Sequence, residues 1–323
     1  MTDIIQAKKT APLGYHYTNT GILPNEWTSR PLSSIVEEIT ETAGTRKIET
    51  ISISAGVGFV NQAEKFGKEL SGKQYEKYTV LHRGDFSYNK GNSNLYPQGC
   101  IYRLNDRTEA AVPNVFESFR VSDGNPDFYE QLFISGFLNR QLYYRINRGV
   151  RDDGLLNLRG KDFYSCEVPC PPLAEQERIA EILMQCDKVI ELKQKRIEEE
   201  KKKKKYLMQT LLSPTSGVRL PGFSGAWKES RIGDIAKMFS GGTPTSSNQA
   251  YYAVSGIPFI RSGEIIKNLV ISYPEHMEQS AIYSVLNAQD SVIDKLEAEL
   301  SVYREKKTAL AQLLLTGIVR TKV

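Results

Sequence analysis

A chain of 323 residues is long enough for two domains of ordinary size, each with its own core. Hydrophobic residues make up 40% of it and the mean hydropathy is −0.40; its apolar runs are too short to cross a membrane, which excludes a membrane protein. The net charge of +4 permits a polyanionic partner without requiring one.

Cysteine and histidine are sparse and scattered. The four cysteines lack C-x-x-C spacing and the three histidines lie far apart, so we expect no metal site and free thiols in a reducing cytosol. Residues 1–22 are interpreted as an N-terminal extension. They contain no apolar signal-peptide region, which favours a cytoplasmic protein.

Residues 23–172 are predicted to form a compact domain of mixed α/β type. Residues 48–60 alternate apolar and polar side chains around Gly-x-Gly, and residues 78–91 indicate strand, turn and strand. Residues 125–146 have helical periodicity with aromatic side chains on one face, and Pro171-Pro172 ends the domain.

Two long helices are predicted, over residues 173–213 and within residues 278–323, which include a C-terminal tail. Each carries a heptad seam, and the expected seam residues are Leu183, Ile190, Ile197, Leu207, Leu286, Ile293, Leu300 and Leu310. Such a seam is buried only against another helix. We expect an antiparallel coiled coil within the chain, and pairing with a second copy is the alternative.

The second helix repeats the first. Residues 175–190 recur 103 positions later as residues 278–293, and Trp27 has a counterpart in Trp227. From the tryptophan to the helix glutamate the first half has 148 positions and the second 51, so the second is 97 shorter. Residues 214–277 are therefore interpreted as a truncated copy of the first domain.

Motifs with chemical meaning are incomplete. Gly67-x4-Gly72-Lys73 is followed by Gln74 where a phosphate-binding loop needs Ser or Thr, and a surface loop is the better interpretation. The tetrapeptide NPDF (125–128) lacks the second proline of amino-methyltransferases, so we predict no catalytic residues. The charge run at residues 198–205 is interpreted as a solvated helix with Glu–Lys pairs, or alternatively as a surface for phosphates.

Two stretches have the composition of a DNA-binding surface. Residues 88–99, YNKGNSNLYPQG, are rich in groups that can hydrogen-bond base edges, although an ordinary loop has a similar composition. Residues 143–163 concentrate basic side chains that suit phosphates or a solvated face. The candidate DNA-binding residues are Arg83, Tyr88, Asn89, Lys90, Asn92, Asn94, Arg145, Arg148, Arg151, Arg159 and Lys161.

Several segments resemble the specificity (S) subunit of Type I restriction-modification systems. GLLNLRGKDFYSCEVPCPPLAEQERIAEIL (154–183) resembles the end of a target-recognition domain entering a conserved helix, and DFSYNKG (85–91) is similar to a motif within such domains. GAWKESRIGDIAKMFSGGTPTSSNQAYY (225–252) resembles the opening of a second domain. REKKTALAQLLLTGIVR (304–320) resembles the usual ending.

The resemblance implies a subunit without catalysis or cofactor of its own. Each recognition domain would read half of a bipartite site on double-stranded DNA, and the helices would set the gap. The helices would also dock modification subunits, which bind S-adenosylmethionine and methylate adenine. Restriction subunits would join these to cleave unmethylated DNA in defence against phage.

The shortened second domain leaves alternatives open. The chain could read one half-site, or two copies could pair so that their first domains read a symmetric site, which is favoured. It could also be a non-functional product. A decoy that binds modification subunits without reading DNA, and a stand-alone DNA methyltransferase, are the rival functions.

Overall fold

The computed structural model describes residues 11–62, 72–91, 96–146, 156–237 and 266–322. The chain divides into two compact units, one formed by Met1–Val189 with Tyr303–Val323 and the other by Ile190–Val302. Each is described by itself below, as unit 1 and unit 2.

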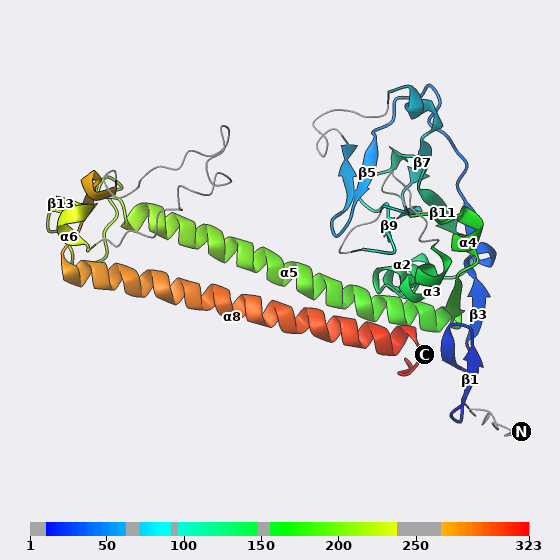
Figure 1. Cartoon of the computed structure of the whole chain (residues 1–323). Helices are drawn as coiled ribbons and strands as arrows, with labels where there is room; N and C mark the ends of the chain where they lie inside the picture. The colour runs from blue at the N-terminus through cyan, green and yellow to red at the C-terminus, as the bar shows by residue number, and fades with distance from the viewer. Residues whose placement is uncertain (1–10, 63–71, 92–95, 147–155, 238–265, 323) are drawn as a thin grey trace, which may run out of the picture. The chain divides into compact units, whose positions relative to one another are not determined.

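Unit 1 contains the first domain, whose strands pair in short antiparallel sheets (Figure 1). The largest sheet has the order β4-β11-β8-β9, with β4 at Val36–Glu38, β11 at Glu117–Val121, β8 at Phe86–Asn89 and β9 at Cys100–Arg103. The two-stranded sheets pair β1 (Tyr15–Thr18) with β2 (Gly21–Pro24), β3 (Thr28–Pro31) with β12 (Glu167–Cys170), β5 (Ile51–Ser54) with β6 (Gly58–Asn61), and β7 (Thr79–His82) with β10 (Glu109–Val112). The predicted strand pairs around residues 48–60 and 78–91 are thus present. The β1–β2 hairpin shows that ordered structure begins within the predicted extension.

Short helices cover the largest sheet. They are α2 (Pro126–Ile134), α3 (Asn139–Arg145) and α4 (Gly160–Tyr164), with 3₁₀ turns η1 (Leu32–Ser34) and η2 (Gly72–Lys77) elsewhere. The side chain of Asn125 caps α2 by accepting from the backbone N–H groups of Asp127 and Phe128. Phe86, Phe119 and Phe133 then pack together, with Phe86 stacked on Phe119 and Phe133 edge-on to both.

The same core takes in both long helices. Ile179 and Leu183 come from the start of α5 (Leu173–Leu211), and Leu314 and Leu315 come from the end of α8 (His276–Leu315). All four are at most 2% exposed, so burial of apolar area fixes the first domain to this helix pair within unit 1.

Helices α5 and α8 pair antiparallel in both units, as the heptad pattern predicted (Figure 1). In unit 1 Lys307 forms an ion pair with Asp187, and in unit 2 Lys204 forms one with Asp290. Of the predicted seam residues, Leu183, Ile197, Ile293 and Leu300 are buried, and Ile190, Leu207, Leu286 and Leu310 are half-buried. The intramolecular coiled coil is confirmed.

The charge run in α5 is largely paired with acids. Lys203 lies 3.7 Å from Glu200 on the same helix, and Lys201 lies 2.6 Å from Glu297 on α8. Glu200 sits on the seam and accepts a hydrogen bond of 2.7 Å from Gln289. The run therefore forms a polar stretch of the coiled coil, in which Glu200, Lys201, Lys203 and Lys204 have partners within unit 2.

The rest of unit 2 is small. Strand β13 (Lys228–Arg231) pairs antiparallel with β14 (Val270–Tyr273), and the single-turn helix α6 (Ile232–Ile235) follows β13. Across residues 190–237 and 266–302 these two strands form the only sheet that the structure describes. This agrees with a partial second recognition domain.

Candidate nucleic-acid interface

The β8–β9 connection begins and ends at closely packed residues. The ring of Tyr88 is fully buried and stacks on Phe163 with 4.6 Å between ring centroids. Its hydroxyl donates to the backbone carbonyl of Gln98 at 2.7 Å, and burial raises the pKa of that phenol. Gly99 has a φ of +76°, and a Cβ there would lie 2.4 Å from the carbonyl oxygen of Asn89. The hairpin base is therefore tightly determined.

Asn89 and Lys90 leave β8 with their side chains already bonded. The Asn89 side-chain oxygen accepts from the backbone N–H of Gly91 at 2.7 Å, which shapes a local turn. Lys90 Nζ lies 2.8 Å from Glu117 Oε1, and both side chains are only 15% exposed. Lys90 thus supports the sheet beneath the loop and does not extend into solvent.

The backbone of Lys90 joins the two predicted DNA-binding stretches. Its carbonyl oxygen accepts from the backbone N–H of Leu156 at 2.8 Å. Residue 90 lies in the Asn-rich stretch (88–99), and residue 156 lies in the Arg-rich one (143–163). These two residues therefore lie side by side, although 66 positions separate them in the sequence.

Basic side chains on α3 and α4 remain at the surface. Arg145, half-buried, donates to Ser165 Oγ at 3.2 Å and to its carbonyl at 3.3 Å. Arg159 is bonded to Asp162, and this hydrogen bond lowers the pKa of the carboxyl group. Lys161 is exposed. These groups can exchange their partners for DNA phosphates at small cost because they are already solvated.

The predicted residues thus separate into three groups. Arg83, Arg145, Arg159 and Lys161 are accessible at least in part, while Tyr88, Asn89 and Lys90 hold the hairpin base. The prediction that Tyr88 contacts DNA is at odds with its complete burial. Asn92, Asn94, Arg148 and Arg151 lie outside the described residues.

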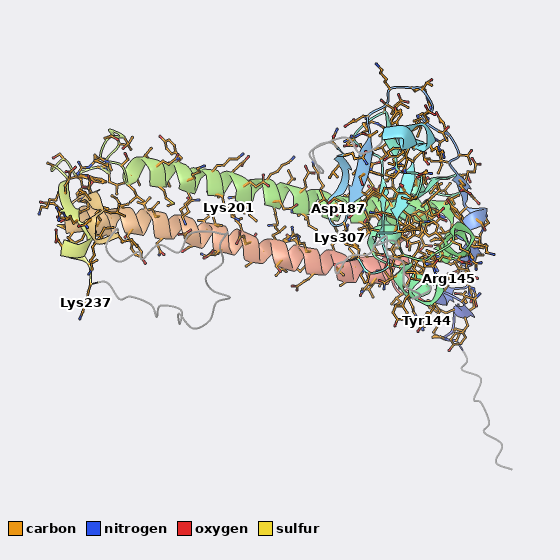
Figure 2. The ribbon with its side chains drawn as sticks, turned by 45° about the horizontal axis from the view of Figure 1, so that its top comes forward. Tyr144, Arg145, Asp187, Lys201, Lys237 and Lys307 are labelled. Atoms are coloured by element: carbon orange, nitrogen blue, oxygen red, sulfur yellow. The ribbon has the colours of Figure 1, made fainter. Side chains whose placement is uncertain are left out.

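One surface was missed by sequence reasoning. Tyr144 is 75% exposed on α3 beside Arg145, as Figure 2 shows. A cavity of about 550 Å³ lies between this helix and the β1–β2 turn, and its lining includes Arg140, Tyr144, Arg145 and Asn19. Both tyrosines of the Tyr143-Tyr144 doublet are exposed, and nothing in the periodicity of residues 125–146 distinguished them from the buried aromatic side chains of α2.

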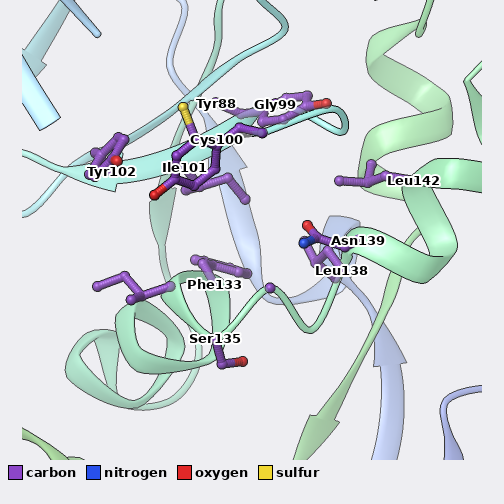
Figure 3. A pocket seen from close by; sticks show the side chains of 13 residues that line it. Tyr88, Gly99, Cys100, Ile101, Tyr102, Phe133, Ser135, Leu138, Asn139 and Leu142 are labelled. Carbon is purple, nitrogen blue, oxygen red and sulfur yellow. The ribbon is translucent and has the colours of Figure 1, made fainter. Parts of the chain in front are cut away.

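A second, smaller cavity lies between β9 and the α2–α3 turn (Figure 3). Its volume is about 170 Å³, and its lining includes Tyr88, Ile101, Phe133, Leu138 and Leu142. The described residues around it carry no ionisable side chain other than tyrosine and cysteine. The lining residues therefore offer no carboxylate, histidine or lysine side chain for acid–base chemistry.

Within the described residues there is no group of three His, Cys, Asp or Glu side chains able to hold a metal ion. In that same part of the chain, every helix is too short or too polar to cross a membrane.

The sequence matches a class of DNA-specificity proteins. Residues 2–201 match the family described as the Type I restriction modification DNA specificity domain. This match covers more than half of the chain, and the protein belongs to that family.

Individual relatives are distant. The chain is 22% identical over 289 residues to the Type I restriction enzyme MjaIX specificity subunit of Methanocaldococcus jannaschii, a match covering 82% of this chain and 64% of that protein. It thus spans less than two thirds of that relative's length.

Solved structures share the fold. The Type I S subunit from M. genitalium aligns with a TM-score of 0.54 at 15% identity, over 90% of this chain and 96% of its own. A chain from a structure concerned with complex assembly and conformational transition of the type I R-M system gives 0.57 at 16% identity, over 92% and 99%.

Proposed function

We propose that this protein is a sequence-specific DNA-recognition subunit of a Type I restriction-modification complex, and that the domain in unit 1 reads a half-site. The observation that carries the proposal is the hydrogen bond from Leu156 N–H to the Lys90 carbonyl. It joins one residue of the Asn-rich stretch (88–99) to one residue of the Arg-rich stretch (143–163). One surface can then supply both base contacts and phosphate contacts.

The proposed roles follow the chemistry of the side chains. Asn92 and Asn94 contact base edges, where an amide can both donate and accept. Arg148, Arg151, Arg159 and Lys161 contact phosphates, with Arg83 and Arg145 at the margin. Tyr88, Asn89 and Lys90 act beneath them by fixing where the loop leaves the sheet.

Methylation and cleavage belong to partner subunits in this proposal. Modification subunits that bind S-adenosylmethionine dock on the α5–α8 pair and methylate adenine, and restriction subunits join that complex. This chain supplies site recognition and binds no cofactor.

The test begins by finding the target. The protein is co-expressed with modification subunits, and methylated adenines are mapped by sequencing to give the recognised motif. Asn92→Ala and Asn94→Ala are then compared with Asn114→Ala, an exposed asparagine in the turn before β11. Loss of a base contact should cost about 1–3 kcal/mol of discrimination at one position. Unchanged discrimination in both variants would remove these base-reading roles.

Two copies in one complex would supply two half-site readers. The reduced second domain favours this arrangement, because a bipartite site needs a reader at each end. Mass measurement of the complex with modification subunits distinguishes one specificity chain from two.

The rival functions give different results. A decoy would bind modification subunits without sequence-dependent retardation of DNA. A stand-alone methyltransferase would bind S-adenosylmethionine in a calorimetric titration of the isolated chain, where we expect no heat of binding.

A further inference from the structure

The start of α5 contains a buried carboxylate held by the far end of the chain. Glu175 is 2% exposed and accepts from the indole N–H of Trp27 at 2.8 Å. Arg320, which follows α8, donates to the two Glu175 oxygens at 2.7 Å and 2.9 Å. Its remaining terminal nitrogen donates to Glu26 at 2.8 Å. One guanidinium thus bridges the helix start and the domain that precedes it.

The turn that delivers Arg320 is itself fixed on the domain. Gly317 has a φ of +71°, and a Cβ there would lie 2.6 Å from the ring of Pro24. The Tyr15 hydroxyl donates to the Gly317 carbonyl at 3.2 Å. Close packing therefore brings the tail after α8 against β1 and β2, and Arg320 follows three residues later.

Unit 2 contains the same arrangement, built from the other helix ends. Arg219, which follows α5, donates to both oxygens of Glu278 near the start of α8, at 2.6 Å and 2.5 Å. Its guanidinium lies 5.9 Å from the centre of the Trp227 ring, the same distance as between Arg320 and Trp27. Each unit therefore has a tryptophan, a buried glutamate and a following-turn arginine.

The neighbouring glutamines confirm that the two arrangements are equivalent. Gln176 donates to the Pro171 carbonyl at 2.8 Å, and Gln279 donates to the Pro274 carbonyl at 2.8 Å. Two contacts differ. The Trp227 indole N–H is buried without a hydrogen-bond partner among the described residues. The third nitrogen of Arg219 donates to the Gly225 carbonyl at 3.0 Å, where that of Arg320 donates to Glu26.

We propose that Arg320 and Arg219 are positioning residues that make the seating of each domain depend on helix pairing. Each arginine is supplied by the turn after one helix and neutralises the glutamate at the start of the other. A buried carboxylate without its cation is unfavourable, so the domain is held at the helix start only when the antiparallel partner helix is in place. The consequence for DNA reading rests on the proposed function, whereas the seating itself does not.

The two tryptophans of the chain provide the test. In a full-length Trp227→Phe background, Trp27 is the sole reporter. We expect Arg320→Gln to raise its acrylamide quenching constant at least twofold and to shift its emission to longer wavelength. Arg219→Gln in the same background is the matched control, and it should leave Trp27 unchanged.

Two further variants make the result specific to the arginine–glutamate pair. The double variant Glu175→Gln, Arg320→Gln should give a Trp27 quenching constant no larger than that of the more affected single variant. The reason is that both changes remove the same interaction. Arg320→Lys keeps the charge but loses the planar fork, so it should fold and give an intermediate quenching constant. If Arg320→Gln does not fold, Arg320→Lys provides the test.

The outcomes are distinct. Unchanged Trp27 quenching in Arg320→Gln and Arg320→Lys, or an equal effect of Arg219→Gln, overturns the proposal. Because this measurement uses no DNA, it stands whether or not the protein reads DNA. A second experiment compares gel retardation of the mapped target with that of scrambled DNA. If Arg320 seats the domain, Arg320→Gln should discriminate the two DNAs less well than wild type. Its helical circular dichroism should be unchanged.

Discussion

Lys307 Nζ lies 2.5 Å from Asp187 Oδ1, and the residues 103 positions earlier and later, Lys204 and Asp290, form the same ion pair in unit 2. Figure 2 labels the first pair on α8 and α5. Each helix thus contributes one aspartate and one lysine. These ion pairs fix the antiparallel register of the two helices. The apolar seam alone would not, because leucine and isoleucine tolerate a shift by one heptad.

Reversing Lys204 should weaken unit 2. Lys204→Asp places two carboxylates together, and adding Asp290→Lys should restore the pair with a coupling free energy of about 0.5–1 kcal/mol. Hydrogen exchange of the backbone amides of residues 282–297 measures both the loss of stability and its recovery. Lys202→Asp, an exposed change on the same helix, is the control, and an equal loss of protection there would refute the pair's role.

Residues 1–222 alone should form a symmetric dimer. Helix α5 carries Glu175, Asp187 and Lys204, and Arg219 follows it, so two antiparallel copies can satisfy one another's contacts. Light scattering after gel filtration should give twice the fragment mass. Lys204→Asp removes two pairs at once and should shift the fragment toward monomer; a monomeric parent fragment would contradict the prediction.

Gly99→Ala should destabilise unit 1 by more than about 2 kcal/mol, because its Cβ collides with backbone as well as occupying the left-handed region. The obstructing atoms are the Asn89 carbonyl at 2.4 Å and the Tyr88 ring at 2.6 Å. Gly44→Ala is the matched control, since φ is +54° there and nothing lies within 4 Å. Urea unfolding compares them, and equal losses would show that crowding is unimportant.

Lys90 and Lys161 should respond oppositely to replacement by methionine. Lys90→Met leaves Glu117 unpaired and should cost about 1–3 kcal/mol of stability. Lys161→Met should leave stability within about 0.5 kcal/mol. It should also reduce the salt dependence of DNA binding by about one phosphate contact. Unfolding and salt titrations measure the two effects, and a stable Lys90→Met protein with weak DNA binding would reverse the assignment.

Glu130 should make unit 1 less stable as pH rises. Burial raises its pKa, with Arg103 opposing, so the folded state binds the proton more tightly than the unfolded state. Stability is then lost as pH increases through the raised pKa, and Glu130→Gln should gain on wild type as pH rises above the ordinary glutamate range. Asp106→Asn should show the opposite slope, because its hydrogen bond from Arg107 lowers that carboxyl pKa. Parallel pH profiles of the two variants would contradict the assignment.

Local patterns predicted the fold well. The heptads predicted two long helices, and the structure has them at Leu173–Leu211 and His276–Leu315, since seam periodicity is encoded in every turn. Strand pairs were found because alternation and turn residues act over a few positions. The composition of residues 88–99 was a poorer guide, although Phe86 and Tyr88, two apart on β8, already indicated a shared inward face.

Contacts between distant residues were beyond sequence reasoning. Lys90 was predicted to contact DNA, but its side chain pairs with Glu117, which lies 27 positions away in the sequence. The bond from Arg320 to Glu175 spans 145 positions, and nothing in the periodicity of either segment indicates it. The repeated Glu175 and Glu278 were visible in the sequence, but their partners follow different helices.

The contact between Tyr15 and Gly317 brings the beginning and the end of the described chain to one place. The order in which the chain connects its segments should then matter little to the packing of unit 1. A permuted gene could join the tail to residue 11 through a short linker and open the chain at residues 213–217. Its product would retain the hydrogen bonds that hold Trp27, Glu175 and Arg320 together.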